Sequence, residues 1–384
     1  MTKRRIHTIF NLVAGALALC GCTNHEGEFF EAVKHDHSAI LFGVYSASPS
    51  TRAGDSYITT TSFSEGDAIG VMGFYHDKST WDSDKGTLEP NFMYDQAVIK
   101  KENGSWEYSP LKYWPNETDG GETEKDVDGN GATSKGGPDR LSFYGYYPYR
   151  TSDNGITLPT NETPGMGTWN FEVKANAAEQ VDFMMSQLVP DMTKPKIGET
   201  IELKFSHLLS RVTVAATLSD ELVKDGCTLE IQQVIFGQIY TDGELTPEYD
   251  NDKKTTTFKW NNIQSPERLY CNWSNEKGKE NNNVFLMLPQ TLQADATLAI
   301  KYTITFPADK DNKYGYKYTD MSGSVLLSKG KDQSGNTVES WVMNKAYQYN
   351  VEINLDEILF DAEVYDWIND GYGIKELDTK KEKI

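Results

Sequence analysis

The sequence contains little of the chemistry from which enzymes build active sites. There are six histidines among 384 residues, and the chain has no H-E-x-x-H, G-x-S-x-G, Walker or C-x-x-C motif. Only His76 and His207 lie outside the N-terminal segment, and a hydrolase triad would need one of them as its base. His207 stands among apolar neighbours in KFSHLLSRV, which favours a buried structural histidine. We therefore expect no catalytic residue, no enzymatic activity and no cofactor.

Cysteine is also scarce. Of the four cysteines, only Cys227 and Cys271 lie in the body of the chain. They offer one intramolecular disulfide, but sequence does not show that they are close, and two separately buried thiols are the favoured interpretation. His35 and His37 could hold a stray metal ion, yet we predict no metal site.

Long apolar runs are absent beyond the N-terminus. The run 9–19 follows a basic stretch and is too short to cross a membrane, so residues 1–21 are predicted to be a secretory signal peptide. It ends in LALCGC, where Cys22 follows a small residue and resembles the lipidated cysteine of a bacterial lipobox. Cys20 would follow Leu19, which is too large. Acyl chains on Cys22 would anchor the protein to a membrane; the alternative is an ordinary signal peptide that ends in cysteine.

Basic residues are outnumbered. Lys and Arg total 37 against 57 Asp and Glu, and the formal net charge is −20. Binding to nucleic acid depends on neutralising phosphates with basic side chains, so we expect no nucleic-acid partner. This balance is more typical of a surface protein whose copies repel one another.

What the sequence does contain is a succession of short β-strand patterns. Asn103-Gly104 lies between two apolar stretches and predicts a hairpin over 91–115. In 297–306, every second residue from Leu298 to Phe306 is apolar, which indicates a half-buried antiparallel strand. There is no βαβ alternation and no long amphipathic helix. The sequence therefore predicts an all-β sandwich architecture.

A change of composition marks the expected domain boundary. PDMTKPKIGET, at 190–200, has two prolines and no apolar periodicity. We therefore expect an N-terminal β-sandwich domain over 53–196 and a C-terminal one over 197–384. The segment 22–52 precedes them.

Two features admit a binding role. DVDGNG, within the acidic loop 126–137, matches the first half of an EF-hand loop, but its twelfth position is Gly137 in place of Glu. An ordinary acidic loop is favoured, with weak calcium binding as the alternative. The many Trp and Tyr residues between Trp106 and Tyr149 could stack on sugar rings or fill a sandwich core, and the core is favoured.

Several segments, taken in order, resemble a known family. They are FSEGDAIGVMGFY, WEYSPLKYWP, RLSFYGYYPY, IELKFSHLLSRVTV and the C-terminal FDAEVYDW. Together they resemble the fimbrillin (Mfa-like) family, surface lipoproteins of the Bacteroides group that build type V pili, over most of 38–367. The resemblance implies two transthyretin-like antiparallel β-sandwich domains in tandem. It also implies a location in the fimbrium or on the cell outer membrane, and Glu26 and Glu28 resemble the group's signal for export to that surface.

The resemblance further implies a processing step. An Arg-directed protease removes the N-terminal segment with its first strand, and the open groove accepts a strand from the next subunit. In SPSTRAGD, Arg52 is the only Lys or Arg between Lys34 and Lys78. Its small and polar neighbours suit an accessible loop, so the predicted cut lies between Arg52 and Ala53. A solvated loop charge is the alternative.

The predicted removable strand is SAILFGVYSA, at 38–47, and its loss would expose an unpaired sheet edge. The residues on its inner face are Ile40, Phe42 and Val44. The candidate donor strand is 358–367, although a different C-terminal stretch is an alternative. Its alternating residues are Phe360, Ala362 and Val364.

Two functions from different classes follow. The first is a fimbrial subunit that is lipidated, cut and assembled by strand exchange for adhesion, as stalk, anchor or tip. Its partners would be other fimbrial subunits, the Arg-directed protease, the outer membrane through the lipid, and ligands on host or bacterial surfaces. The alternative is a monomeric surface lipoprotein that binds glycans.

The N-terminal residue of protein recovered from the cell surface tests the processing site. We expect Ala53, because Arg52 is an isolated basic residue in an accessible loop. N-terminal sequencing by mass spectrometry identifies it. An Arg52→Ala variant is the control and should keep lipidated Cys22 as its first residue. Surface polymer at the wild-type level in that variant would contradict the prediction.

Overall fold

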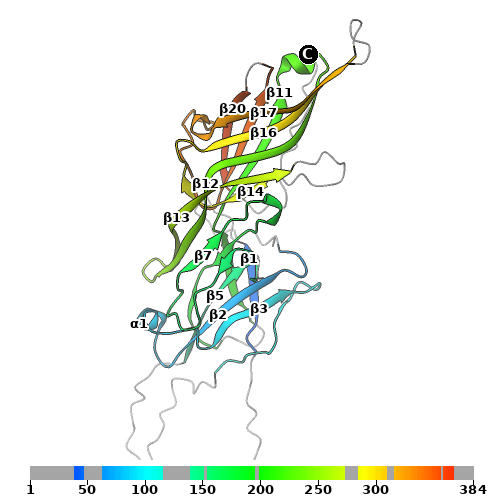
Figure 1. Cartoon of the computed structure of the whole chain (residues 1–384). Helices are drawn as coiled ribbons and strands as arrows, with labels where there is room; N and C mark the ends of the chain where they lie inside the picture. The colour runs from blue at the N-terminus through cyan, green and yellow to red at the C-terminus, as the bar shows by residue number, and fades with distance from the viewer. Residues whose placement is uncertain are drawn as a thin grey trace, which may run out of the picture. The chain divides into compact units, whose positions relative to one another are not determined.

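A computed structural model describes residues 39–46, 63–115, 139–150, 154–194, 199–272, 284–308, 315–355 and 358–366. Nearly all secondary structure in these ranges is β-strand (Figure 1), which confirms the all-β prediction. The helices are short turns: α1 (Trp81–Asp84), α2 (Asp220–Lys224), η1 (Ala177–Glu179) and η2 (Leu327–Lys329). None of the helices in the described ranges has the length and apolar character needed to cross a membrane.

The first sheet has eight strands in the order β1-β10-β8-β5-β2-β3-β4, with β9 paired to β5. The bounds are β1 Phe42–Ser46, β2 Ala68–His76, β3 Met93–Lys100, β4 Trp106–Glu107, β5 Arg140–Tyr147, β8 Met184–Ser186, β9 Val189–Met192 and β10 Ile201–His207. The predicted hairpin is confirmed, because β3 and β4 pair across a turn in which Gly104 has a φ of +84°. This sheet is apolar on both faces, since Phe143 and Tyr144, adjacent on β5, are both buried and join different cores.

One face of the first sheet encloses a core that we call the N-terminal core. Its members are Ile40, Phe42, Val44, Phe63, Ile69, Val71, Met93, Val98, Trp106, Tyr108, Trp114, Leu141, Phe143, Met184, Ile201, Leu203 and Phe205. The sheet curls around it, so that β1 at one end approaches the chain that follows β4 at the other. Ile40 N–H donates to the Lys112 carbonyl at 3.0 Å, and Ala39 forms a β-bridge with Tyr113. Strand β1 therefore closes the curled sheet.

Three further sheets complete the described fold. The second sheet has the order β14-β11-β19-β20, the third has β17-β16-β12-β7-β6 with β13 paired to β12, and β15 pairs with β18. The bounds are β6 Ile156–Thr157, β7 Trp169–Glu172, β11 Ser210–Leu218, β12 Thr228–Asp250, β13 Thr255–Asn272, β14 Val284–Met287, β15 Gln290–Thr291, β16 Thr297–Phe306, β17 Tyr316–Leu326, β18 Ser340–Trp341, β19 Lys345–Ile353 and β20 Ile358–Asp366. Their inner side chains and the other face of the first sheet form one larger core.

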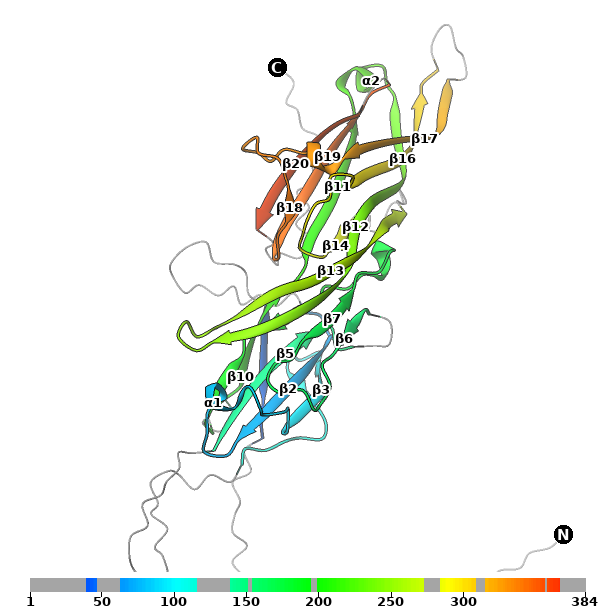
Figure 2. The same ribbon diagram turned by 60° about the vertical axis from the view of Figure 1, so that its left-hand side comes forward.

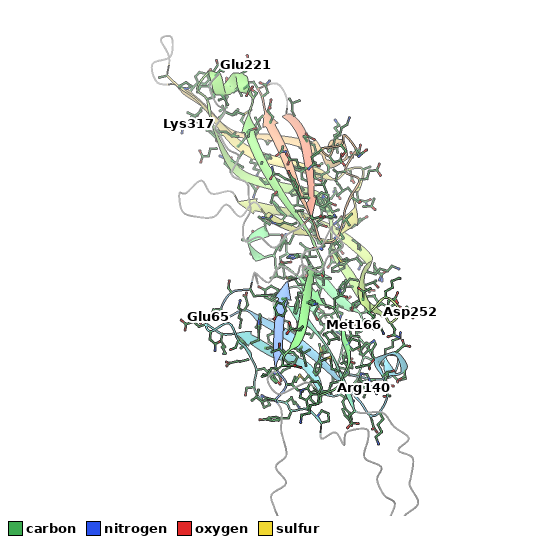
Figure 3. The ribbon with its side chains drawn as sticks, turned by 180° about the vertical axis from the view of Figure 1, so that it is seen from behind. Glu65, Arg140, Met166, Glu221, Asp252 and Lys317 are labelled. Atoms are coloured by element: carbon green, nitrogen blue, oxygen red, sulfur yellow. The ribbon has the colours of Figure 1, made fainter. Side chains whose placement is uncertain are left out.

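The longest feature is the hairpin of β12 and β13, which Figure 2 shows as an extended ribbon with its turn at Asp252, labelled in Figure 3. The first part of β12 pairs with β16 and its later part pairs with β7. The sequence patterns predict shorter separate strands, because Gly243 and Pro247 ordinarily weaken a strand. A register shift against β13 lies at Gly243, and Pro247 lies beyond the β7 ladder, opposite Phe258 of β13.

Side-chain amides fasten this hairpin to the rest of the fold. The Gln187 Oε1 accepts from Thr256 N–H at 2.5 Å, and Thr256 Oγ1 accepts from Leu188 N–H at 2.9 Å. Farther along, Trp260 Nε1–H donates to the Leu208 carbonyl at 2.7 Å. One backbone N–H and two side chains of β13 therefore find partners outside its own ladder, as buried polar groups require.

The structure differs from the sequence-based expectation in strand direction. The pairs β1–β10 and β11–β19 are parallel, whereas an antiparallel architecture was expected. Parallel neighbours need long connections, and these pairs join segments far apart in the chain, which periodicity cannot reveal. The predicted division between residues 196 and 197 stays a prediction. Strand β10, which follows that point in the chain, pairs within the first sheet.

Gly70 offers a test of packing in the first sheet. It lies opposite Tyr146, and a Cβ built at Gly70 would stand 2.0 Å from the Tyr146 ring. We expect Gly70→Ala to lower the free energy of unfolding by about 1–3 kcal/mol, because the ring must leave its position. Urea unfolding measures this. Gly86→Ala, where a Cβ meets nothing within 4 Å, is the control and should change stability by less than about 0.5 kcal/mol. Equal effects of the two substitutions would refute this account.

Candidate functional site

The three residues predicted on the inner face of the removable strand are all buried. Ile40, Phe42 and Val44 are 0%, 3% and 2% exposed, whereas Leu41 between them is 36% exposed. The alternation of inner and outer side chains inferred from the sequence is thus confirmed in the structure. These side chains enter the N-terminal core from an edge strand, whose partner within the sheet is β10.

Phe42 sits at the centre of this contact. Its ring centroid lies 5.7 Å from that of Tyr108 and 5.6 Å from that of Phe143, which meets it edge-on. Such aromatic pairs add to the free energy of burying the rings. Tyr108 also donates its O–H to the Ile40 carbonyl at 2.9 Å. Tyr108 thus contacts the Phe42 side chain of β1 and also holds the backbone just before that strand.

The backbone edge and the outer face of β1 are fitted to β10 as closely. Phe42 pairs with Ile201 and Val44 with Leu203 in parallel register. A Cβ at Gly43 would lie 2.8 Å from the Glu202 Oε1, so a larger residue would displace that side chain. Burial raises the pKa of Tyr45, and its hydrogen bond with the Glu202 carboxylate raises it further. The site is therefore a slot with requirements on both faces of its occupant.

The predicted donor residues lie in β20, at the edge of the second sheet. Ala362 is buried and Phe360 and Val364 are half-buried, and the Phe360 ring stacks on Tyr349 at 5.1 Å. The outer edge of β20 is partly covered, since Ala362 N–H donates to the Lys331 carbonyl at 3.0 Å. The Gln333 side-chain amide also accepts from the Val364 N–H at 3.3 Å and donates to the Val364 carbonyl at 3.4 Å. In this structure β20 is an integral strand of its own subunit.

Several predicted sites lie outside the described residues. They are the lipidation site Cys22, the processing site Arg52 and Ala53, the histidines His35 and His37, and the acidic loop 126–137. Each of these stays a prediction. Within the described ranges, no group of three or more His, Cys, Asp or Glu side chains is arranged to hold a metal ion.

The two body cysteines do not pair. Cys227 is a buried free thiol, whose pKa is raised by burial and by the nearby Asp225. The backbone of Cys271 is opposite Val234 on β12, seven residues beyond Cys227. Seven extended residues span about 23 Å, whereas bridged Cα atoms lie about 4.4–6.8 Å apart. The favoured interpretation, without a disulfide, is confirmed.

Sequence reasoning missed one arrangement of catalytic residue types. His76 on β2 contacts Asp84 Oδ2 through Nδ1 at 2.9 Å and Ser142 Oγ through Nε2 at 2.8 Å. When Nδ1 carries the proton it donates to the Asp84 carboxylate, and Nε2 can then accept the Ser142 O–H. Ser142 lies 66 residues from His76, so no local motif announces the contact.

Burial assigns this arrangement a structural role. Ser142 and His76 are both fully inaccessible, and Ser142 Oγ also accepts from Asp191 N–H at 3.0 Å. A nucleophile must reach its substrate, and this serine does not reach solvent. The network instead ties α1, β2, β5 and β9 together. His207 is likewise buried, against Asp182 at 2.8 Å, which confirms the structural interpretation of that histidine.

Most of the aromatics between Trp106 and Tyr149 fill the cores. Trp106, Tyr108, Trp114, Tyr144 and Tyr146 are each at most 8% exposed. The core interpretation is confirmed for them, whereas Tyr113 is exposed and Tyr149 is half-buried.

Comparison with known proteins gives concordant matches. A family model described as fimbrillin-like matches residues 137–367. "Fimbrium subunit Fim1C" of Phocaeicola vulgatus is 26% identical over 210 residues, which cover 52% of this chain and 48% of that protein. The match thus spans about half the length of that relative.

Two solved structures share the fold. A fimbrial protein from Bacteroides vulgatus superposes with a TM-score of 0.54 at 18% identity, over 85% of this chain and 99% of that one. A candidate cell adhesion protein from Bacteroides ovatus gives a TM-score of 0.51 at 15% identity, over 86% and 98%. At these identities the likeness concerns the fold alone.

The Asp84 carboxylate makes the buried network sensitive to acid. Burial opposes its ionisation, but hydrogen bonds from Ser79, His76 and Ser83 outweigh burial and hold its pKa below the ordinary 3.8. A carboxyl with a lowered folded pKa stabilises the fold above its unfolded pKa, and this is lost as the pH falls through the folded value. We expect Asp84→Asn to lower the free energy of unfolding by about 1–3 kcal/mol at pH 7, with a smaller further loss in acid than the wild type.

Urea unfolding at several pH values between neutral and about 3 checks this. Asp82→Asn changes an exposed carboxylate of the same helix and is the control. Parallel pH profiles for the wild type and Asp84→Asn would argue against the role given to Asp84.

Proposed function

The chain belongs to the fimbrillin-like family, and from this we propose that it is a subunit of surface fimbriae that assembles by exchange of β-strands and serves adhesion. The observation that carries the proposal is the burial of Ile40, Phe42 and Val44 in an edge strand. The naming of the Phocaeicola vulgatus relative as a fimbrium subunit supports it. The role is structural, and no step of it requires catalysis.

Removal of β1 would create two deficits together. The β10 edge would lose its parallel partner, and the Lys112 carbonyl would lose the Ile40 N–H. The surfaces of Tyr108 and Phe143 that Phe42 covers would meet water. Burying three large side chains contributes about 1.5–3 kcal/mol for each one. An incoming strand satisfies backbone and pocket at once, which is how strand addition gains affinity and specificity.

The route to this state is proposed from the sequence. The chain would be exported with a lipid on Cys22, reach the outer membrane surface, and be cut after Arg52 by an Arg-directed protease. The cut would free the peptide that contains β1 from the rest of the subunit. The lipid would leave with it, so assembled copies would be held by their neighbours.

The donor is proposed to come from the C-terminal region, with β20 as the candidate. Its residues Phe360, Ala362 and Val364 share one face, as a strand that enters the slot requires. To donate, β20 must first leave β19 and the contacts with Lys331 and Gln333. A different C-terminal segment remains the alternative donor. The alternative function is a monomeric surface lipoprotein that binds glycans.

Cleavage in vitro tests assembly. The full chain, treated with an arginine-specific endopeptidase, should lose its N-terminal peptide and form ladders that resist SDS, because another subunit's strand replaces β1. The Arg52→Ala variant, treated in the same way, is the control and should stay monomeric. A cut wild-type chain that stays monomeric and binds a polysaccharide would favour the alternative function.

A peptide of residues 38–47 tests the slot itself. In about tenfold molar excess it should prevent ladder formation by occupying the vacated site. The same peptide with Phe42→Asp should not compete, because it would bring a charge between Tyr108 and Phe143. Equal inhibition by both peptides would show that the contacts of Phe42 do not govern assembly.

A further inference from the structure

A concave site lies between β3, residues 149–150 and residues 156–161. Its volume is about 680 Å³, and its lining includes Tyr94, Tyr149, Arg150, Thr157 and Asn161. Among the described residues that line it, Arg150 is the one charged side chain. That charge is notable in a chain with a formal net charge of −20. Sites of this kind, with aromatic walls and a few polar groups, bind small ligands.

A β-bulge aims residues of β3 at this site. Strand β2 pairs with β3 as Val71–Gln96 and then as Gly73–Met93, so Tyr94 and Asp95 together oppose the single residue Met72. Asp95 has a φ of +50°, which is uncommon for a residue other than glycine. Bulges redirect side chains and are frequent beside binding sites. Backbone strain of this sort persists where the surrounding structure imposes it.

A buried hydrogen-bond network holds the charged residue in place. The Asp95 carboxylate, 6% exposed, accepts from Tyr146 O–H at 2.5 Å and from Arg150 Nε–H at 2.8 Å. The Arg150 side chain is nevertheless 51% exposed. Among the described residues, its terminal Nη groups donate no hydrogen bond. Tyr94 O–H donates to the Pro159 carbonyl at 2.9 Å, which fixes the aromatic wall. The site is therefore organised before any ligand arrives, which lowers the entropy cost of binding.

We propose that this site binds a saccharide that carries a carboxylate. The free Nη edge of Arg150 matches a carboxylate, which guanidinium groups bind through paired hydrogen bonds. Tyr94 and Tyr149 provide apolar surface for the C–H face of a sugar ring. The hydroxyl of Thr157 and the amide of Asn161 can bond sugar hydroxyls. A neutral sugar would leave the Nη edge without its best partner.

Such a site rests on the proposed function only for its biological role, as a receptor contact in adhesion. It needs neither cleavage nor polymerisation, because every residue that builds it belongs to one chain. Saccharide binding can therefore fail while fimbrial assembly succeeds, and assembly can fail while binding succeeds. The two proposals are tested separately.

Calorimetry on the full, uncut chain tests the proposal with three probes: 3′-sialyllactose, digalacturonate and lactose. We expect at least one acidic probe to bind, and lactose to bind at least about tenfold more weakly, the ratio that corresponds to about 1.4 kcal/mol. Arg150→Gln should weaken the acidic probe by at least about tenfold. Because this change also leaves Asp95 without its partner, Asn161→Trp serves as a second variant, which obstructs the site from an exposed position.

Tyr318→Ala removes an exposed aromatic residue of β17 and is the matched control; it should bind as the wild type does. Thermal unfolding of each variant establishes that it is folded. The proposal is overturned if neither acidic probe binds, if lactose binds as tightly, or if folded Arg150→Gln or Asn161→Trp retains wild-type affinity.

Discussion

The gap that β1 fills is the constraint on which the first sheet depends. The sheet is curled, so its two ends, β10 and the chain around Lys112, face each other across the width of one strand. Strand β1 satisfies both ends through its backbone and fills the N-terminal core through Phe42. A sheet that lacks this strand exposes polar backbone and apolar side chains at one place. Water can solvate the polar backbone groups but not the apolar side chains, so a further β-strand is the occupant that corrects both deficits.

The larger core does not depend on that strand. Its buried members include none of the inner residues of β1, which all belong to the N-terminal core. Strand β12 pairs with β16 and with β7, so one continuous ladder carries the third sheet. Side-chain amides supply hydrogen bonds where the ladder is irregular. Gln290, for example, accepts from the Tyr240 N–H and donates to the Tyr240 carbonyl, both at 3.0 Å, beside a register shift. A subunit whose slot opens can therefore keep most of its packing, which assembly by strand exchange requires.

Sequence reasoning succeeded where the signal is local. Alternation identified the inner faces of β1 and β16, and Asn103-Gly104 identified the β3–β4 hairpin. It failed where the cause is remote. The length of β12 depends on β7, β13 and β16, the parallel partner of β1 lies some 160 residues away, and Ser142 meets His76 only after β2 and β5 pair. The bulge at Tyr94 and Asp95 carries no glycine, and Met72, Tyr146 and Arg150 bond Asp95 from distant parts of the chain.

The shape of the slot also limits how β20 could fill it. The inner residues of the 38–47 segment, Ile40, Phe42 and Val44, have medium, large and medium side chains, whereas those of β20 are Phe360, Ala362 and Val364. A register that places Ala362 where Phe42 lies would leave a void between Tyr108 and Phe143, and losing an aromatic side chain from a core costs about 3–5 kcal/mol. A register with Phe360 in that place fills the void and puts Ala362 at one of the smaller flanking positions. A strand that shifts by two residues keeps the same side chains on its inner face, so this second register is available. The Phe42 pocket would therefore select the register of a β20 donor, and a C-terminal segment without an aromatic residue at that position would be a poorer occupant.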